Sequence, residues 1–319
     1  MYRRILVPLD GSRFSENAIP RALAIGGEEP SRVHLVAVAG SSIGTEARTA
    51  VRAPAEAEDR TRAIHAADRY LEGVEERLGA LAPEAQVSRR ALPPGNVAHS
   101  LRREIEEESL DLVVMSTHGR GGVRRAWLGS VADGLIRSSP VPVLLVRPEG
   151  EGADSEEYPD PLSEPAAGPF RHVLVPVDRS PDSADLVRHA VGVARGGAKV
   201  TLLHVVPPVP AGAYPYMTLP AREDESAEEL VRTAEEELES LAAGIRGKGI
   251  SVDVKVVAPS EPVPGIFSVA EEGGVDVIAM STRGRGGVAR LLLGSVADKV
   301  IRASRMPVLV YRPPEEQVG

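Results

Sequence analysis

The sequence contains no cysteine, so it forms no disulfide, offers no thiolate to a metal and has no thiol nucleophile. Aromatic residues are also scarce, at 3% of the 319 residues. A core must therefore be built from valine, leucine, isoleucine and alanine, a composition that favours a parallel β-sheet covered by helices. No run of 18 apolar residues and no secretion signal is visible, so we expect a cytoplasmic protein without a membrane partner.

An excess of basic charge is missing too. The chain carries 37 Lys and Arg against 46 Asp and Glu, for a net charge of −9. The electrostatic footprint of a nucleic-acid-binding protein is therefore absent, and we expect no nucleic-acid partner. The most acidic stretch is 149–169, which holds seven acidic residues, no basic residue and several Pro and Gly. It has no apolar periodicity and is interpreted as a flexible, exposed linker.

What the sequence does contain is an internal repeat. Residues 3–18 resemble residues 171–186, and residues 111–148 match residues 276–313 at 24 of 38 positions. A period of this length indicates a duplicated domain rather than a solenoid of short units. The predicted organisation is a first domain at 1–148, the linker at 149–169, a second domain at 170–314 and a tail at 315–319.

Each repeat alternates apolar strands with helical patterns, which predicts parallel βαβ units in an α/β fold with doubly wound sheets. Strands such as "ILVPL" are apolar on both faces, as a sheet covered on both sides requires. In the first repeat the strands are expected at 4–9, 33–39, 86–92, 112–116 and 141–147, and the helices at about 15–24, 56–81, 96–107 and 129–137. In the second repeat the long helix is expected at 226–245.

A glycine-rich loop follows the fourth strand of each repeat: "MSTHGRGGVRRAWLGSVAD" at 115–133 and "MSTRGRGGVARLLLGSVAD" at 280–298. Each loop ends where a helix begins, and the free N–H groups and the dipole of a helix N-terminus favour phosphate. Thr117, Arg120, Arg124 and Arg125 are further candidate donors. The alternative stays open that the glycines only form a turn and that Ser130 only caps its helix.

A carboxylate closes the first strand of each repeat, as Asp10 in "LVPLDGS" and as Asp178 in "LVPVDRS". At the carboxyl end of a parallel strand it could accept a hydrogen bond from a sugar hydroxyl or an adenine amine. The alternative is an Asp that caps the following helix.

Motifs of other chemistries are missing. The sequence has no GxxxxGK[ST] loop and no GxSxG elbow, and its seven histidines are scattered. We therefore expect no catalytic residue and no metal site.

Together, "ILVPLDGS", "VHLVAVA" and the spacing from Gly119 to Gly129-Ser130 resemble the universal stress protein family. The resemblance covers both repeats, so the chain looks like a tandem member. It implies two doubly wound domains, each with a five-stranded parallel sheet in the order 3-2-1-4-5 and helices on both faces. It also implies that domains pair through their last strands, here within one chain, and leaves open a homodimer and an unidentified protein partner.

ATP-binding members carry Gly, two residues, Gly, nine residues, Gly and then Ser or Thr. Here Ser116 and Ser281 replace the first glycine. If that position needs a positive φ, Ser would disfavour the bound geometry; if φ is ordinary, Ser is harmless, and we expect the second. Arg179 also stands where the first repeat has Gly11, so the two sites are expected to differ in affinity.

By this resemblance the cofactor is ATP, alone or with Mg²⁺, and the nucleotide-binding residues are Pro8, Leu9, Asp10, Val38, Met115, Ser116, His118, Gly119, Gly129, Ser130 and Val131 in the first repeat, and Pro176, Val177, Asp178, Val205, Met280, Ser281, Arg283, Gly284, Gly294, Ser295 and Val296 in the second. The leading hypothesis is an ATP-binding regulator of the stress response. The alternatives are an interaction scaffold that binds no nucleotide and a slow ATPase. We expect that the protein is not an enzyme.

Overall fold

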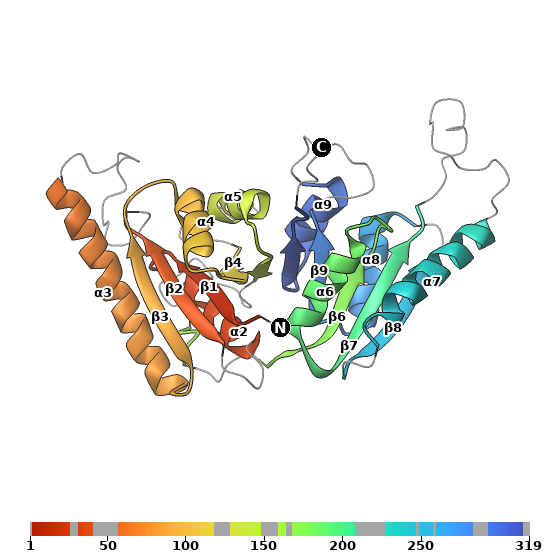
Figure 1. The fold of residues 1–319 in the computed structure, drawn as a ribbon, viewed down its shortest axis with the longest axis horizontal. Helices are drawn as coiled ribbons and strands as arrows, with labels where there is room; N and C mark the ends of the chain where they lie inside the picture. Colours follow the sequence, from red (N-terminus) through yellow and green to blue (C-terminus); the bar gives the residue numbers. More distant parts are fainter. Residues whose placement is uncertain are drawn as a thin grey trace, which may run out of the picture. The chain divides into compact units, whose positions relative to one another are not determined.

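The computed structural model describes residues 2–25, 31–40, 57–117, 128–147, 159–163, 168–207, 227–246, 249–257, 260–282 and 293–314. Contacts divide the chain into two compact units. The first is Met1–Pro169 with Pro307–Gly319, and the second is Phe170–Met306. Both units are α/β, with strands and helices alternating along the chain, as the sequence predicts (Figure 1).

The first unit has the strand order that the family resemblance implies. Its strands are β1 (Arg4–Leu9), β2 (Arg32–Val38), β3 (Gln86–Leu92), β4 (Leu112–Ser116) and β5 (Val143–Val146). They lie parallel in the order β3-β2-β1-β4-β5. Contacts also place β10 (Val308–Tyr311) in this unit, where it runs antiparallel to β5.

The helices of the first unit come between these strands. They are α1 (Arg13–Glu16), α2 (Ala18–Ile25), α3 (Ala57–Leu81), α4 (Val97–Glu107) and α5 (Ser130–Ser138). The expected helix at 15–24 is thus two shorter helices, because the chain turns at Asn17, which is the C-cap of α1.

The second unit repeats the plan. Its strands are β6 (Phe170–Pro176), β7 (Ala194–Val205), β8 (Ser251–Val257) and β9 (Val277–Ser281), all parallel in the order β8-β7-β6-β9. Its helices are α6 (Ser183–Val193), α7 (Ala227–Ala243), α8 (Pro262–Glu272) and α9 (Ser295–Ala303). In the described part of the chain, no helix is both long and apolar enough to span a bilayer.

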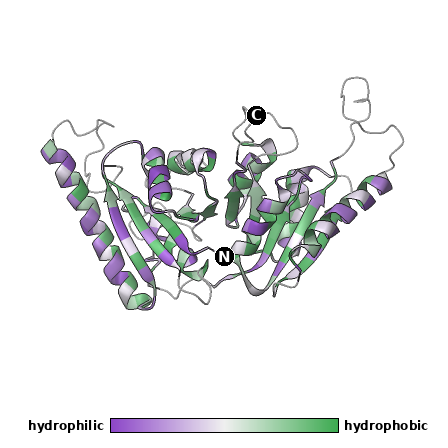
Figure 2. Ribbon diagram, in the orientation of Figure 1, coloured by the Kyte–Doolittle hydropathy of each residue, from purple (hydrophilic) through white to green (hydrophobic). Residues whose placement is uncertain are grey.

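The core of each unit lies around its central strands. Ile5, Leu6 and Val7 on β1 are fully buried, so successive side chains are covered on both faces of the sheet. The long helix α3 buries one stripe and leaves its other face polar (Figure 2). Its buried positions are Ala67, Leu71, Val74 and Leu78, spaced at three and four residues as an amphipathic helix requires.

The linker differs from the expectation of a wholly exposed segment. Residues 159–163 are described, and Leu162 there is only 6% exposed. Asp160 accepts two hydrogen bonds from Arg77 Nη1, at 3.0 and 3.1 Å. Further along, Arg21 Nη1 donates to the carbonyl of Gly168 at 2.9 Å. This part of the linker is therefore packed on the first unit, because an apolar side chain and a carboxylate find partners there.

Candidate ligand-binding sites

The carboxyl ends of two adjacent strands form the candidate site in each unit. In the first unit β1 is paired with β4, and Asp10 follows the end of β1 while Thr117 follows the end of β4. In the second unit β6 is paired with β9, and Asp178 and Thr282 lie just beyond the ends of these strands. Each aspartate and threonine therefore lie at the carboxyl ends of two adjacent parallel strands, the edge where α/β sheets bind ligands.

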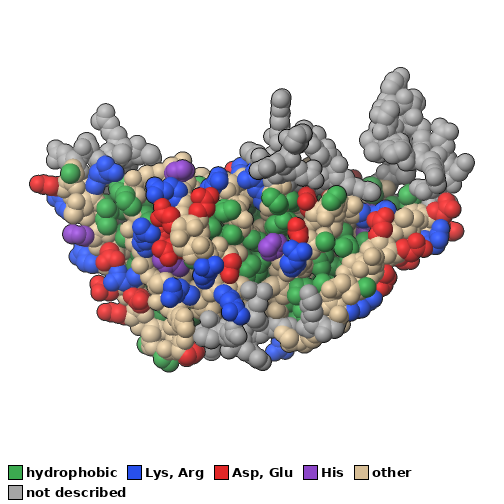
Figure 3. Space-filling model, in the orientation of Figure 1, with side chains coloured by type: hydrophobic (Ala, Val, Ile, Leu, Met, Phe, Trp, Pro, Cys, Tyr) green, Lys and Arg blue, Asp and Glu red, His purple; other side chains and the backbone are tan. Residues whose placement is uncertain are grey.

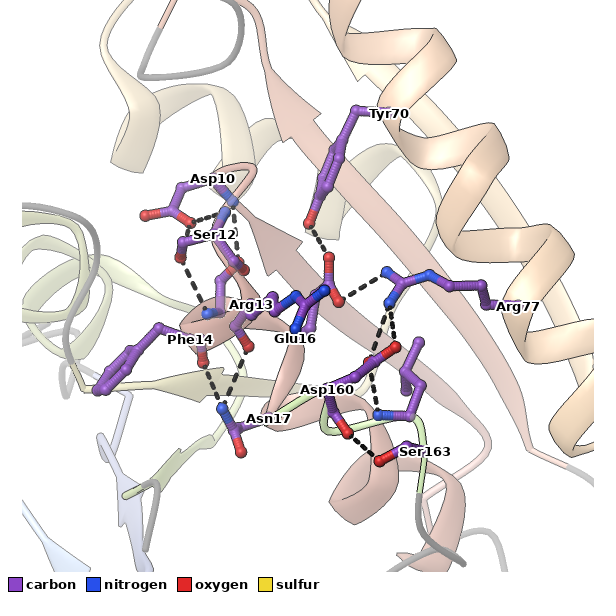
Figure 4. Close-up of polar contacts among 12 residues, drawn as sticks. Asp10, Ser12, Arg13, Phe14, Glu16, Asn17, Tyr70, Arg77, Asp160 and Ser163 are labelled. Atoms are coloured by element: carbon purple, nitrogen blue, oxygen red, sulfur yellow. Dashed lines mark hydrogen bonds and ion pairs between the residues drawn. The ribbon is translucent and has the colours of Figure 1, made fainter. Parts of the chain in front are cut away.

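The carboxylate of Asp10 organises the turn that leads into α1 (Figure 4). Its Oδ1 accepts from the N–H of Ser12 at 3.0 Å and from the Ser12 hydroxyl. The same Ser12 hydroxyl accepts from the N–H of Ser15 at 3.1 Å and so caps the helix. Asp10 therefore supports the cap residue rather than capping α1 itself. Gly11 makes the turn possible with a φ of 84°.

Within the described structure, one oxygen of the Asp178 carboxylate has a hydrogen bond and the other has none. Its Oδ1 accepts from the N–H of Ser180 at 3.1 Å, whereas its Oδ2 is buried and has no hydrogen-bond partner among the described residues. Thr282, at 0% exposure, likewise has an unpartnered Oγ1. A buried oxygen without a hydrogen bond is costly, so this edge of the second unit is suited to a polar group from a ligand.

Arg179 takes the place of Gly11 and adopts the same left-handed backbone, with a φ of 64°. This conformation costs a non-glycine residue about 1–2 kcal/mol. Its guanidinium makes a bidentate ion pair with Glu237 on α7. The turn beside Asp178 is therefore held to α7 by a contact that Gly11 cannot make.

Ser116 and Ser281 lie at the ends of β4 and β9, and neither has a positive φ. The substitution of the family's first glycine by serine therefore imposes no left-handed strain here, as expected. The buried Ser116 hydroxyl donates to the carbonyl of Phe14 at 2.8 Å. This bond ties the end of β4 to α1.

Gly129 and Gly294 are the N-cap residues of α5 and α9, with ordinary φ values of −63° and −66°. Their N–H groups donate to the carbonyls of Thr117 and Thr282, at 2.9 and 2.7 Å. A Cβ at either glycine would lie 3.3 Å from that same carbonyl oxygen. Close approach of the loop to the strand end, rather than backbone conformation, therefore explains glycine at these positions.

Ser130 and Ser295 are the first residues of these helices. Both are exposed, and neither hydroxyl makes a hydrogen bond within the described structure. The capping alternative for Ser130 is therefore wrong, since the N-cap is Gly129 and no side chain caps α5. The first N–H groups of a helix have no partner within it, so each serine presents its hydroxyl beside open donors.

The other predicted binding residues are buried or half-buried near the two strand edges, or lie outside the described residues. Leu9, Val38, Met115, Val177, Val205 and Met280 are buried, and Pro8, Val131, Pro176 and Val296 are half-buried. His118, Gly119, Arg283 and Gly284 lie outside the described residues, as do Arg120, Arg124 and Arg125. Within the described ranges, no cluster of three or more His, Asp or Glu could hold a metal ion.

Sequence reasoning missed a polar cluster next to the first site. Glu16, at the end of α1, is 2% exposed and accepts from Tyr70 at 2.8 Å and from Arg77 at 2.7 Å (Figure 4). Burial raises the pKa of Tyr70, and the Glu16 carboxylate raises it further. Comparison of the two repeats could have pointed to this cluster. The second repeat has Ala184 at the position of Glu16, so the carboxylate belongs to the first repeat alone.

Comparison with known proteins gives a consistent result. The family model described as "Universal stress protein family" matches residues 1–147 and 169–312. A universal stress protein of Mycobacterium tuberculosis is 31% identical over 211 residues, which are 66% of this chain and 64% of the relative. The chain thus spans less than two thirds of that relative's length. One from Methanocaldococcus jannaschii is 30% identical over 151 residues, 46% of this chain and 85% of the relative.

Among solved structures, a universal stress protein from Archaeoglobus fulgidus matches with a TM-score of 0.57 and 21% identity. The match covers 98% of this chain and 97% of that one, and it confirms the fold. A universal stress protein solved in complex with cAMP matches 44% of this chain with a TM-score of 0.32.

Proposed function

Because the chain belongs to the universal stress protein family, we propose that it is a nucleotide-binding regulator of the stress response with one ATP site in each repeat. Its predicted role is to bind ATP and change what it presents to partners, rather than to catalyse a reaction. A cytoplasmic location, a homodimer and an unidentified protein partner stay predictions of the sequence.

The observation that supports the proposal most directly is found in the second unit, where an open donor and acceptors without a partner among the described residues lie at one strand edge. The first unit supplies the matching donor. Ser130 and Ser295 present hydroxyl groups that make no hydrogen bond to the described residues, and they do so at helix N-termini, where phosphate oxygens are favoured. Asp178 Oδ2 is a buried acceptor to which no described residue donates. A nucleotide supplies both complements, since its phosphates accept hydrogen bonds and its adenine amine and ribose hydroxyls donate them.

The residues present therefore fit an adenine nucleotide. Asp10 and Asp178 would hold the adenine or ribose end, with Val38 and Val205 as apolar walls. Gly129, Ser130 and Val131 would hold phosphate through backbone N–H groups and the serine hydroxyl, as would Gly294, Ser295 and Val296. Bound Mg²⁺ would neutralise part of the phosphate charge.

The face of the first unit drawn in Figure 3 offers no reason to propose nucleic acid. On the face drawn in Figure 3, acidic and basic side chains are intermingled over the first unit. Several acidic and basic side chains of the described residues form ion pairs along helices, such as Arg102 with Glu106 and Arg103 with Glu107. A mixed surface of this kind provides no continuous basic track for a phosphate backbone.

The proposal is tested by purifying the protein without added nucleotide, denaturing it and resolving the released compounds by anion exchange. We expect up to two ATP per chain for the wild type, one for Gly129→Ala or Gly294→Ala, and none for the double variant. Each added methyl would press on the carbonyl of Thr117 or Thr282 and displace the helix N-terminus. Gly73→Ala is the matched control, because nothing lies within 4 Å of its Cβ.

The other outcomes separate the alternatives. No released nucleotide, together with no saturable uptake of added ATP, would overturn the proposal in favour of an interaction scaffold. Release of ADP that grows with time and requires Mg²⁺ would indicate a slow ATPase.

A further inference from the structure

The short helix α1 is held at its beginning by the first ligand-binding edge. Ser12, its cap, is bonded to the Asp10 carboxylate. Phe14, in its first turn, accepts the Ser116 hydroxyl from the end of β4. Both contacts come from residues at the carboxyl ends of β1 and β4, so the position of α1 depends on the geometry of that edge.

At its other end α1 is connected to the linker. The carboxylate of Glu16 accepts from Arg77 Nη2 at 2.7 Å, while Nη1 of the same guanidinium donates to Asp160 at 3.0 and 3.1 Å (Figure 4). One arginine of α3 thus bridges a buried carboxylate of α1 and a carboxylate of the linker. Such forked contacts are directional, so a shift of Glu16 would move the donor that Asp160 uses.

Asp160 also folds its own segment of the linker. Its Oδ1 accepts from the N–H of Leu162 at 3.0 Å, and its carbonyl accepts from the Ser163 hydroxyl at 2.7 Å. Burial opposes ionisation of this carboxyl, but the bonds from Leu162 and Arg77 outweigh it and hold its pKa below the usual value. The turn at 160–163 and its docking therefore depend on the same carboxylate.

The second repeat lacks this connection. Ala184 replaces Glu16, and Pro181 replaces Arg13. The buried positions of α3 and α7 match at an offset of 167, as Ala67 with Ala234 and Leu71 with Leu238 show, so Tyr70 corresponds to Glu237. Glu237 binds Arg179 of its own turn instead. The long helix α3 is bonded to the end of α1, and α7 is bonded to the turn after the first strand of its own repeat. Among the described residues, the extension of this contact to the linker occurs in the first repeat.

We propose that ligand binding at the first site is coupled, through α1 and Arg77, to docking of linker residues 159–163, and that the second site is not coupled to it. The inference rests on the proposed function for the identity of the ligand. A ligand that bonds to the Asp10 carboxylate restrains the turn at Asp10–Ser12, keeps α1 in place and so holds Glu16 and Arg77 in position for Asp160. Because coupling is reciprocal, a docked linker strengthens binding at the first site by the same factor.

The connection from α1 to the linker is tested without any ligand, by measuring the rate of hydrogen exchange at the Leu162 amide. Ser12→Ala removes the cap of α1 and is expected to speed this exchange about 5-fold. The matched control is Ser180→Ala, the equivalent change in the second repeat, which should leave the Leu162 rate unchanged. An unchanged rate in Ser12→Ala, or equal acceleration by both variants, would overturn the proposal.

The ligand-linked part is tested with ATP as the probe in two single-site backgrounds. Gly294→Ala leaves the first site and Gly129→Ala leaves the second. Adding Asp160→Asn weakens the contact with Arg77 but keeps an acceptor for Leu162. We expect ATP affinity to fall about 5-fold in the first background, a typical coupling factor, and not at all in the second.

The results distinguish the two proposals. Equal or no effect of Asp160→Asn in the two backgrounds, with ATP binding intact, would overturn the coupling alone. Absence of ATP binding in both parent backgrounds and in the wild type would overturn the proposed function, and with it the role of ATP as the coupled ligand. The exchange experiment would still decide whether α1 connects the site edge to the linker.

Discussion

Arg77 and Glu16 form an ion pair of unequal exposure. The Nη2 to Oε2 distance is 2.7 Å, and the side chain of Glu16 is 3% exposed while that of Arg77 is 37% exposed. The glutamate thus has its charge compensated inside the protein, whereas the arginine keeps access to water. Loss of the arginine would leave a buried carboxylate with the Tyr70 hydroxyl as its one remaining side-chain donor among the described residues. Loss of the glutamate would leave a guanidinium that water can still solvate.

We expect Arg77→Ala to lower the free energy of unfolding by about 2 kcal/mol. Removal of one partner of a buried pair costs about 3–5 kcal/mol, and the partial exposure of Arg77 reduces this. Urea denaturation gives the measurement. Arg62→Ala is the control, since its pair with Asp59 is exposed on both sides and should be worth less than about 0.5 kcal/mol. Equal effects of the two variants would contradict the assignment.

A second prediction concerns the contact between α4 and α5. A Cβ at Gly134 would lie 2.8 Å from the Cβ of Ala98, so Gly134→Ala should destabilise the protein by about 1–3 kcal/mol through overpacking. Gly73→Ala, in the open interior of α3, should instead stabilise it by up to about 1 kcal/mol, because Ala has the higher helix propensity.

Thermal and urea denaturation measure the stability of both glycine variants. The double variant Gly134→Ala with Ala98→Gly should regain most of the stability that Gly134→Ala loses. Removal of the methyl group at residue 98 makes room for the one added at residue 134. A Gly134→Ala protein as stable as the wild type would show that α5 moves away from α4 without cost.

A third prediction concerns the serine that replaces the family's first glycine. Ser116→Gly restores the family pattern but removes the donor to the Phe14 carbonyl, so we expect a loss of about 1 kcal/mol in stability. We expect no gain in ATP affinity, because Ser116 has no positive φ to relieve. Calorimetric titration with ATP measures the affinity, and urea denaturation measures the stability. A tighter ATP complex in Ser116→Gly would mean that serine does impair the site.

A fourth prediction concerns pH. Burial holds the pKa of His189 below its ordinary value of 6.5; Asp185 opposes this, and Arg188 adds to it. The unfolded chain therefore takes up this proton at higher pH than the folded chain does. Stability should be full above about pH 6.5 and decline as the pH falls from there toward the folded pKa, by at most about 1.4 kcal/mol per pH unit.

His189→Gln removes this contribution, so the melting temperature of the variant should decline less than that of the wild type between pH 7.5 and 5.5. A His189→Gln profile that follows that of the wild type would contradict the assigned role of burial.

Much of the fold could be predicted from the sequence because its signals are local and occur twice. The apolar strands, the long amphipathic helix and the glycine at each helix start have periods and spacings that short-range geometry dictates. The division of 15–24 into α1 and α2 was missed, since a single turn with its own cap has almost no periodic signal. The docked piece of the linker was missed because its acidic, proline-rich composition predicts exposure, whereas Asp160 and Leu162 find specific partners.

The candidate site was predictable in part for the same reason. The sequence indicated that Asp10 and Gly129 end up at one edge, since the carboxyl ends of parallel strands meet there. It could not indicate how each polar group is used. Whether Ser116 donates to a ligand or to the chain, and whether Ser130 caps its helix, depends on atoms brought in by other segments.

By itself the sequence determined the α/β class and the duplication, because alternating hydrophobicity and repeated spacing restrict a chain to few topologies. The strand order was implied by the resemblance of its motifs to a known family. Only the tertiary structure decided which polar groups are bonded and which are left open. Glu16 meets an arginine 61 residues away, and Ser116 meets a carbonyl 102 residues away. Hydrogen bonding and burial at such separations depend on the final packing, so no local pattern along the chain specifies them.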